Sequence, residues 1–276
     1  MNLLVFQHSA CEHPGIFRSF LRDDGITWHA VELDLGGKIP PLEYYDALWV
    51  MGGPMDVWDI EEFPWLIEEK LAVRRWVRDL NRPFLGVCLG HQLLADSLGG
   101  TCGPQRPPEI GIHDVELTAA SLSDPLFAGL PQTFKTLQWH SVRVAQLPED
   151  AIVMATSPAC RCQAMRVGNC AWSMQYHVEV EATTIPEWGA VSEYAQALER
   201  SHGVGALDRM EDTARAHMPE FGKNAKLIYR NFMTQVLSTR SRYCNLALAN
   251  RESSVTTILA PRLKSVLRHR VQPDAD

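Results

Sequence analysis

Short apolar runs alternate with longer amphipathic runs through the first hundred residues. FLGV (residues 84–87) is apolar throughout, as expected of a strand buried on both faces of a parallel sheet. Residues 64–80 place apolar side chains at helical spacing and end just before Pro83. This alternation predicts βαβ units. The expected strands are LLVF (3–6), WHAVEL (28–33), ALWVMGG (47–53) and FLGV, and the expected helices are residues 15–25, 64–80 and 91–98.

The pattern changes after Gly100. Short β-branched or aromatic runs follow, separated by Pro, Gly and Asn, and they predict strands that extend the sheet, some of them antiparallel. From residue 187 onward the chain becomes helical. The expected strands are HDVELT (113–118), FKTLQWHSVRV (134–144), AIVMATS (151–157), CQAMRV (162–167) and CAWSMQYH (170–177); the expected helices are residues 188–201, 210–218 and 223–237.

Composition indicates an ordinary soluble globular protein of the α/β class. The chain has 276 residues, 46% of them hydrophobic, and a net charge of -7. No apolar stretch approaches the roughly 18 to 20 residues of a membrane span, and the N-terminus carries no pattern of a signal peptide. The acidity does not favour nucleic acid as a partner. Seven cysteines, an odd number without a C-x-x-C pair, favour a reducing cytoplasm over a disulfide framework.

The charge distribution separates a body from a tail. Residues 1–238 show no linker and predict one domain, whereas residues 239–276 carry seven Lys or Arg against three acidic residues. We expect 239–276 to be a basic C-terminal tail with disorder in part of it. Such a tail docks on its own protein, binds a partner or stays in solvent, and the last is the usual behaviour of a terminus. Nothing in the sequence indicates an oligomeric state.

Cys160, Cys162 and Cys170 lie close enough in sequence to raise the question of a metal site. Their spacing matches no zinc pattern. Since free cysteine is among the most buried residue types, core thiols are the favoured interpretation, and no metal or other cofactor is expected.

Cys88 stands between two glycines, in Gly86-Val87-Cys88-Leu89-Gly90, where a buried strand meets a helix. This is the cysteine form of the nucleophile elbow, a sharp turn that exposes a reactive side chain at the carboxyl edge of the sheet. The helix N-terminus favours thiolate and can hold an oxyanion. A packing turn with a core thiol has the same spacing, so the motif alone leaves both interpretations open.

A thiolate enzyme also needs a base and a group that orients it. His177 closes an apolar strand, and Glu179 follows two residues later, so both side chains project to one side. Glu179 is therefore the expected partner of His177. Glu181 lies in the same register and is a second candidate for the partner of His177. Glu179 could alternatively be a solvated surface charge with no role in the site. His91 and His140 have no such partner in the sequence and are weaker candidates for the base.

These segments together resemble the class I (triad) glutamine amidotransferases. MGGPM (51–55) resembles the oxyanion-strand loop of that family, and GVCLGHQLLADSLGG (86–100) its elbow and helix. LQWHSVRV (137–144) resembles the substrate loop, and QYHVEV (175–180) the strand end that carries the last two triad members. The resemblance covers residues 1–237 and is most like stand-alone, GMP-synthase-like members. One departure is Val178, where the family usually has proline, which puts the alignment of His177 with Glu179 in question.

The resemblance implies a flavodoxin-like, open, mostly parallel sheet with helices on both faces and extra antiparallel strands. It implies a triad of Cys88, His177 and Glu179, with an oxyanion hole formed by the backbone N–H groups of Gly53 and Leu89. The residues that it implies for substrate binding are Gly52, Gln92, Trp139, His140 and Ser141.

The expected reaction is hydrolysis of a γ-glutamyl amide through a thioester, releasing glutamate and an amine or ammonia. Two alternatives stay open: a glutaminase subunit that passes ammonia to a separate synthetase partner, and a non-catalytic sensor that binds an amide. No synthetase domain follows in this chain, which slightly favours the free-standing hydrolase. The small-molecule substrate is a γ-glutamyl compound whose leaving amine the sequence does not indicate.

Overall fold

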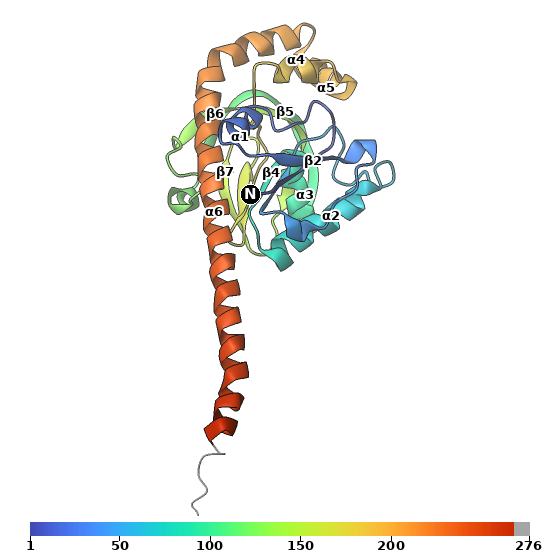
Figure 1. The fold of residues 1–276 in the computed structure, drawn as a ribbon. Helices are drawn as coiled ribbons and strands as arrows, with labels where there is room; N and C mark the ends of the chain where they lie inside the picture. The colour runs from blue at the N-terminus through green and yellow to red at the C-terminus, as the bar shows by residue number, and fades with distance from the viewer. Residues whose placement is uncertain (268–276) are drawn as a thin grey trace, which may run out of the picture. The chain divides into compact units, whose positions relative to one another are not determined.

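A single nine-stranded sheet forms the centre of residues 1–236 (Figure 1). The computed structural model describes residues 1–267, with side chains described through residue 242. The strand order is β2-β1-β3-β4-β9-β8-β7-β5-β6. The strands are β1 (Leu3–Gln7), β2 (Trp28–Glu32), β3 (Ala47–Val50), β4 (Phe84–Val87), β5 (Thr101–Leu117), β6 (Thr133–Gln146), β7 (Ala151–Thr156), β8 (Ala164–Val167) and β9 (Ala171–Met174).

The sheet has a parallel half and an antiparallel half. Strands β2, β1, β3, β4 and β9 pair in parallel, and β8, β7, β5 and β6 continue the sheet antiparallel. All residues of β1, β3, β4 and β9 are buried, as their continuous apolar sequences predict. The predicted α/β fold, with extra antiparallel strands, is confirmed.

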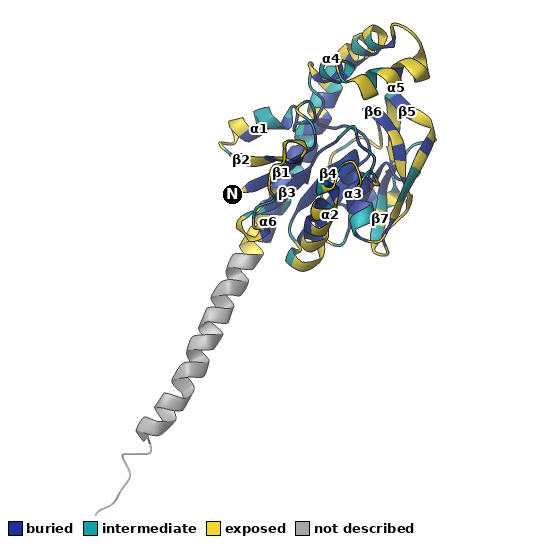
Figure 2. Ribbon diagram, turned by 90° about the vertical axis from the view of Figure 1, so that its right-hand side faces the viewer, coloured by how far each residue is buried: buried dark blue, intermediate teal, exposed yellow. Residues whose placement is uncertain are grey.

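Helices cover both faces of the parallel half. Side chains of α1 and α6 pack with Trp49 in one core, whereas α2 and α3 pack with Leu48 in a second core on the opposite face. Adjacent strand residues point to opposite faces, so one strand serves both cores. Figure 2 shows buried strands between helices whose outer faces are exposed. The α-helices are α1 (Phe17–Asp23), α2 (Trp65–Arg75), α3 (Leu89–Ser97), α4 (Thr184–Gly189), α5 (Ser192–His202) and α6 (Ala206–Leu267); short helical turns are Leu33–Leu35, Leu42–Tyr44, Trp76–Leu80 and Ala119–Ser123.

The helical end of the chain differs from the prediction in two places. The helix expected at 188–201 is two helices, α4 and α5. The helices expected at 210–218 and 223–237 are one, because α6 continues through Pro219 and Gly222. Packing outweighs these helix breakers: beyond them, Ile228 and Phe232 on one face of α6 are buried in the core.

The first compact unit of the chain spans Met1–Val236 and contains the whole sheet. Helix α6 runs past the predicted domain boundary at residue 238, so the backbone of 239–267 is helical. The predicted end of the basic tail, residues 268–276, lies outside the described residues.

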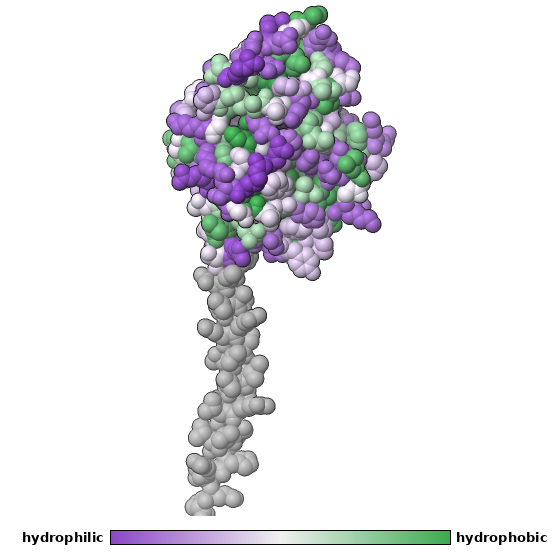
Figure 3. Space-filling model, turned by 45° about the horizontal axis from the view of Figure 1, so that its top comes forward, coloured by the Kyte–Doolittle hydropathy of each residue, from purple (hydrophilic) through white to green (hydrophobic). Residues whose placement is uncertain are grey.

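The surface shown in Figure 3 is mostly hydrophilic, with single hydrophobic side chains scattered among polar ones. Leu35 and Leu71, for example, are exposed on separate elements. Among the described residues, no helix is both long and apolar enough to span a bilayer.

Candidate active site

Cys88 occupies a strained turn between β4 and α3. Its backbone has φ 50° and ψ −103°, a left-handed conformation that a residue with a side chain seldom adopts. The flanking glycines allow this turn because there is no room for a side chain on either. A Cβ built on Gly86 would lie 2.5 Å from the carbonyl oxygen of Gly90, and one on Gly90 would lie 2.1 Å from that of Val50. The glycine spacing is therefore a steric requirement of the turn.

His177 lies beside Cys88, just beyond β9. Its Nδ1 atom is 2.7 Å from Oε1 of Glu179. Burial alone would lower the pKa of His177, but the charges of Glu179 and Cys88 outweigh it and raise the pKa well above its ordinary value. The structure thus brings together the three predicted triad residues, in the order of nucleophile, base and orienting carboxylate that such an enzyme needs.

Glu181, the rival partner, points elsewhere. It forms an ion pair with Arg18, and its Oε1 lies 3.9 Å from Nε2 of His13. The geometry therefore pairs His177 with Glu179.

Backbone contacts hold the segment around Val178 on both sides. The N–H of His177 donates to the carbonyl oxygen of Leu137 at 2.9 Å, and the N–H of Ile16 donates to that of Glu179 at 2.8 Å. Gly15 packs so closely on Glu179 that a Cβ there would lie 1.8 Å from the same oxygen. These contacts align His177 and Glu179 without the proline that the family usually has between them.

The loop after β3 lies against the elbow. The N–H of Gly90 donates to the carbonyl oxygen of Met51, and a Cβ built on Gly53 would lie 2.8 Å from Cδ2 of Leu89. Within the described part of the chain, the N–H groups of Gly53 and Leu89 have no hydrogen-bond partner. Free N–H groups near a nucleophile are what an oxyanion hole requires.

The predicted substrate-binding residues have different environments. The carbonyl oxygen of Gly52 accepts a hydrogen bond from His8, and Gln92 is buried with its amide directed to Val142 and Gln175. The Trp139 ring is buried against Trp188 and Tyr194. His140 is buried, and its Nε2 lies 3.2 Å from Oε2 of Glu109. Ser141 is exposed. Their roles in binding stay predictions.

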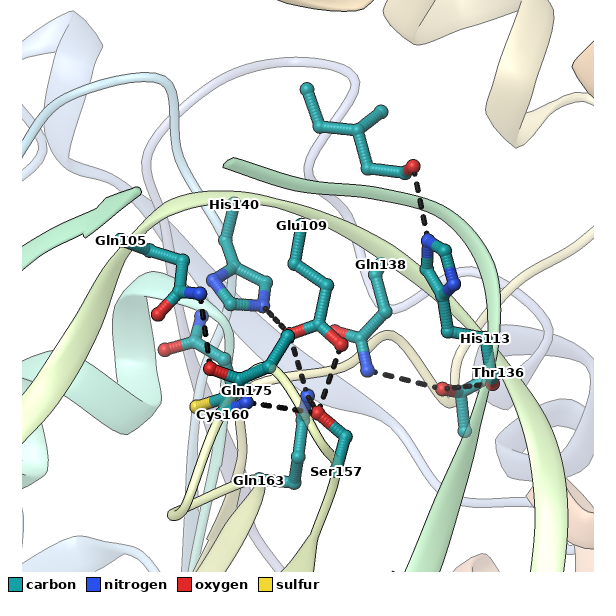
Figure 4. A network of polar contacts seen from close by, with 12 residues as sticks. Gln105, Glu109, His113, Thr136, Gln138, His140, Ser157, Cys160, Gln163 and Gln175 are labelled. Atoms are coloured by element: carbon teal, nitrogen blue, oxygen red, sulfur yellow. Dashed lines mark hydrogen bonds and ion pairs between the residues drawn. The ribbon is translucent and has the colours of Figure 1, made fainter. Parts of the chain in front are cut away.

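A buried polar network joins Gln175 and Gln163 to Glu109 (Figure 4). Glu109 lines a cavity of about 920 Å³. The Gln175 amide lies 3.7 Å from Sγ of Cys88. Glu109 accepts hydrogen bonds from Ser157 and Gln163 and faces His140. Glu109, Ser141 and Ser157 line the cavity, together with Pro107, Pro108, Ile110, His113, Asp114, Pro158, Ala159, Ala197, Arg200, Ser201 and His202. Part of the predicted substrate loop therefore borders this cavity.

The clustered cysteines are core residues. Cys160, Cys162 and Cys170 are all buried, and burial raises the pKa of the Cys160 thiol to about 11. The Cys160 Sγ–H donates to the carbonyl oxygen of Cys162 at 3.5 Å. These environments are those of unreactive thiols.

A family model confirms the resemblance that these features suggested. The model described as "Glutamine amidotransferase class-I" matches residues 22–187, more than half of the chain. The chain belongs to the class I glutamine amidotransferase family.

The names of similar proteins include several different activities. The chain is 29% identical over 206 residues to the glutamine amidotransferase-like protein YfeJ of Salmonella typhimurium, covering 71% of this chain and 82% of that one. It is 31% identical to a subunit of the glutamine-hydrolysing GMP synthase of Sulfolobus acidocaldarius, covering 56% and 78%. It is 26% identical to gamma-glutamyl peptidase 4 of Arabidopsis thaliana, covering 52% and 59%.

The fold agrees with a solved structure of the family. A glutamine amidotransferase from Thermotoga maritima superimposes with a TM-score of 0.74 at 26% identity, covering 84% of this chain and 98% of that one.

The amidotransferase site also contains side chains that the sequence analysis did not identify. Glu12, from the β1–α1 loop, is buried. One of its carboxylate oxygens lies within 4.8 Å of a ring nitrogen of His177 and of a carboxylate oxygen of Glu179. The Tyr194 hydroxyl donates to Oε1 of Glu12 at 2.5 Å, and the Trp188 ring lies 4.4 Å from that of His177. Burial raises the pKa of the Glu12 carboxyl more than the nearby His177 lowers it.

No local signal distinguishes these residues. Glu12 stands in a polar loop, and Trp188 and Tyr194 read as ordinary apolar positions of a helical segment. Only the folded arrangement places them at the site.

Proposed function

We propose that this amidotransferase hydrolyses a γ-glutamyl amide through a γ-glutamyl thioester on Cys88. The observation that carries the proposal is the strained, left-handed Cys88 at the start of α3, whose charge raises the pKa of His177, together with the 2.7 Å contact between His177 Nδ1 and Glu179. A strained cysteine beside an oriented imidazole is the arrangement of a thiolate nucleophile.

In the first half-reaction the Cys88 thiolate attacks the γ-carbonyl carbon, and an S–C bond forms. The oxyanion accepts hydrogen bonds from the N–H groups of Gly53 and Leu89, each worth about 2.7–4 kcal/mol in comparable sites. The C–N bond then breaks while protonated His177 gives its proton to the leaving amine.

In the second half-reaction water attacks the thioester carbon. Neutral His177, held by Glu179, accepts a proton from that water as the new C–O bond forms. The S–C bond breaks, glutamate leaves, and the pair of Cys88 thiolate and His177 imidazolium is restored.

We assign the cavity bordered by Ser141 and Glu109 to the leaving-amine side of the substrate. Ser141 is an exposed residue of the predicted substrate loop. Gln175 links the polar wall of this cavity to Cys88, because its N–H donates to the carbonyl oxygen of Gln163 and its side-chain amide lies 3.7 Å from Sγ of Cys88. The apolar prolines at 107, 108 and 158 and the charged Asp114 and Arg200 give the cavity a mixed lining, which suits an amine that carries both apolar and charged groups.

Similarity to a gamma-glutamyl peptidase supports a hydrolase that works alone. Similarity to one subunit of a GMP synthase supports the second candidate, a glutaminase that delivers ammonia to a synthetase partner.

Purified protein assayed without a partner separates the two. Release of p-nitroaniline from γ-glutamyl-p-nitroanilide, or of amino acid from γ-glutamyl dipeptides, supports the hydrolase if it is absent in Cys88→Ala. Turnover of free glutamine that rises only when a synthetase is added supports the second candidate. Activity that survives in Cys88→Ala contradicts both, and measurable binding without any turnover supports the sensor instead.

A further inference from the structure

A further buried histidine and carboxylate pack against the loop after β3, which contains Gly52 and Gly53. His8 follows the end of β1 and is 1% exposed, and Glu69 on α2 is fully buried. Nδ1 of His8 lies 2.7 Å from the carbonyl oxygen of Gly52, and Nε2 lies 2.9 Å from Oε1 of Glu69. The Trp65 ring stacks on His8, with centroids 5.5 Å apart and planes 12° apart. The imidazole is therefore fixed in position and orientation.

The partners of His8 determine its protonation. The Gly52 carbonyl oxygen can only accept a hydrogen bond, so Nδ1 of His8 carries a proton, and Nε2 faces the carboxyl group of Glu69. Burial alone would lower the pKa of His8, but Glu69 and the Gly52 carbonyl raise it above the ordinary value.

The hydrogen bond to Gly52 constrains the next N–H group. Gly52 C=O and Gly53 N–H belong to one planar trans peptide, in which they point in opposite directions. Holding the carbonyl oxygen on Nδ1 of His8 therefore directs the Gly53 N–H away from that nitrogen. Gly52 also contacts the Glu12 carboxylate, since a Cβ there would lie 2.3 Å from its Oε2.

We propose that His8 and Glu69 are a positioning pair, which sets the orientation of the Gly52–Gly53 peptide and so builds one donor of the oxyanion hole. This inference rests on the proposed function for its catalytic consequence, but its structural content, the peptide orientation, is independent of any activity. His8 contacts no substrate and acts through Gly52.

His8→Ala tests the pair by kinetics. Loss of one oxyanion donor lowers kcat by about 10²-fold, and KM stays within about threefold because ground-state binding is unchanged. Glu69→Gln is the conservative variant: the glutamine amide donates to Nε2 of a neutral imidazole whose Nδ1–H still holds Gly52. Its kcat stays within about fivefold of the wild type. The control is His29→Ala. His29 lies on the edge strand β2, and its side chain makes a hydrogen bond with the Tyr45 hydroxyl rather than with the loop after β3.

A substrate in which sulfur replaces the carbonyl oxygen distinguishes positioning from general damage. Sulfur is a poor acceptor, so the wild type prefers the oxygen substrate strongly and His8→Ala prefers it less. An oxygen-to-sulfur rate ratio that is unchanged in His8→Ala, or a normal kcat, overturns the proposal.

A crystal structure of His8→Ala supplies the readout that does not depend on turnover. The proposal expects the Gly52–Gly53 peptide to be rotated or disordered. A peptide in the wild-type orientation overturns it. If the wild type hydrolyses no γ-glutamyl amide while the peptide rotates in the variant, the proposed function fails and the positioning pair stands.

Discussion

Gly15 and Glu179 are in contact through the backbone, and this contact aligns the predicted triad. Ile16 N–H donates to the Glu179 carbonyl oxygen at 2.8 Å, and a Cβ on Gly15 would lie 1.8 Å from that oxygen. The β1–α1 loop thus holds the residue that orients His177, although the two segments are more than 160 residues apart.

Gly15→Ala should displace Glu179 and lower kcat by about tenfold or more, because a general base misaligned by a fraction of an ångström transfers protons poorly. The measurement is kcat with γ-glutamyl-p-nitroanilide, together with the thermal midpoint. Gly15 has φ +47°, so strain contributes as well. Gly25→Ala is the matched control, because Gly25 has φ +66° but nothing within 4 Å. Equal losses of kcat in the two variants would contradict the role of the contact.

Glu179→Gln should lower kcat by about 10²-fold or more, since the amide stabilises the imidazolium less and permits the wrong tautomer. Glu181→Gln is its control. Glu181 pairs with Arg18 and stands in the same sequence register, so its loss should leave kcat within about twofold, as expected of a partly exposed ion pair. Steady-state kinetics of the two variants show which of the two carboxylates, Glu179 or Glu181, orients His177. The reverse ranking would assign the orienting carboxylate to Glu181.

The activity should fall on the alkaline side of neutrality. Because the pKa of His177 is raised, the imidazolium persists above pH ~6.5, the ordinary value, and is lost as pH rises through the raised pKa. A profile of kcat/KM against pH should show this alkaline limb. In Glu179→Gln one of the two charges that raise the pKa is gone, so the limb moves to lower pH. A limb that stays in place would show that another group titrates.

The proton on His177 also makes the free energy of unfolding depend on pH. The folded-state pKa of His177 exceeds the unfolded value, so its stabilising contribution is complete below about pH 6.5 and is lost as pH rises through the folded pKa. Urea unfolding of the wild type and of His177→Gln should therefore converge at alkaline pH.

Gly53→Ala should lower kcat by about 10²-fold, the usual effect of losing one oxyanion donor. An added Cβ would lie 2.7 Å from Sδ of Met55 and 2.8 Å from Cδ2 of Leu89, so the loop must move. Gly103→Ala is the control, because its nearest neighbour would be 3.8 Å away. The comparison uses kcat at saturating substrate. An unchanged kcat in Gly53→Ala would remove the loop from the oxyanion hole.

The elements that the sequence could predict are those with a local signal. β4 matches its predicted bounds because FLGV is continuously apolar, and the sharp turn at Cys88 is predictable because glycines two residues away on each side make it possible. The contact between His177 and Glu179 is predictable because the two residues are neighbours on one strand end. In each case the deciding residues lie within a few positions of one another.

The residues that the sequence could not predict make contacts with residues far away in the sequence. His8 and Glu69 are 61 positions apart, and Glu12 and Tyr194 are 182 apart. A histidine or a glutamate in isolation is most often a surface residue, and only burial against the oxyanion loop shows otherwise. The continuity of α6 is not predictable from local sequence either, because Pro219 and Gly222 favour a break that the packing of Phe232 and its neighbours overrides.

The most direct test of the account is the mass of the protein during turnover. Wild-type protein mixed with γ-glutamyl-p-nitroanilide and quenched in acid should gain the mass of one glutamyl group, and peptide mapping should locate it on Cys88. Hydroxylamine should remove it, as expected of a thioester. Cys88→Ala should show no adduct and no turnover. Turnover by the wild type with no adduct on Cys88, or with an adduct on another residue, would contradict the account.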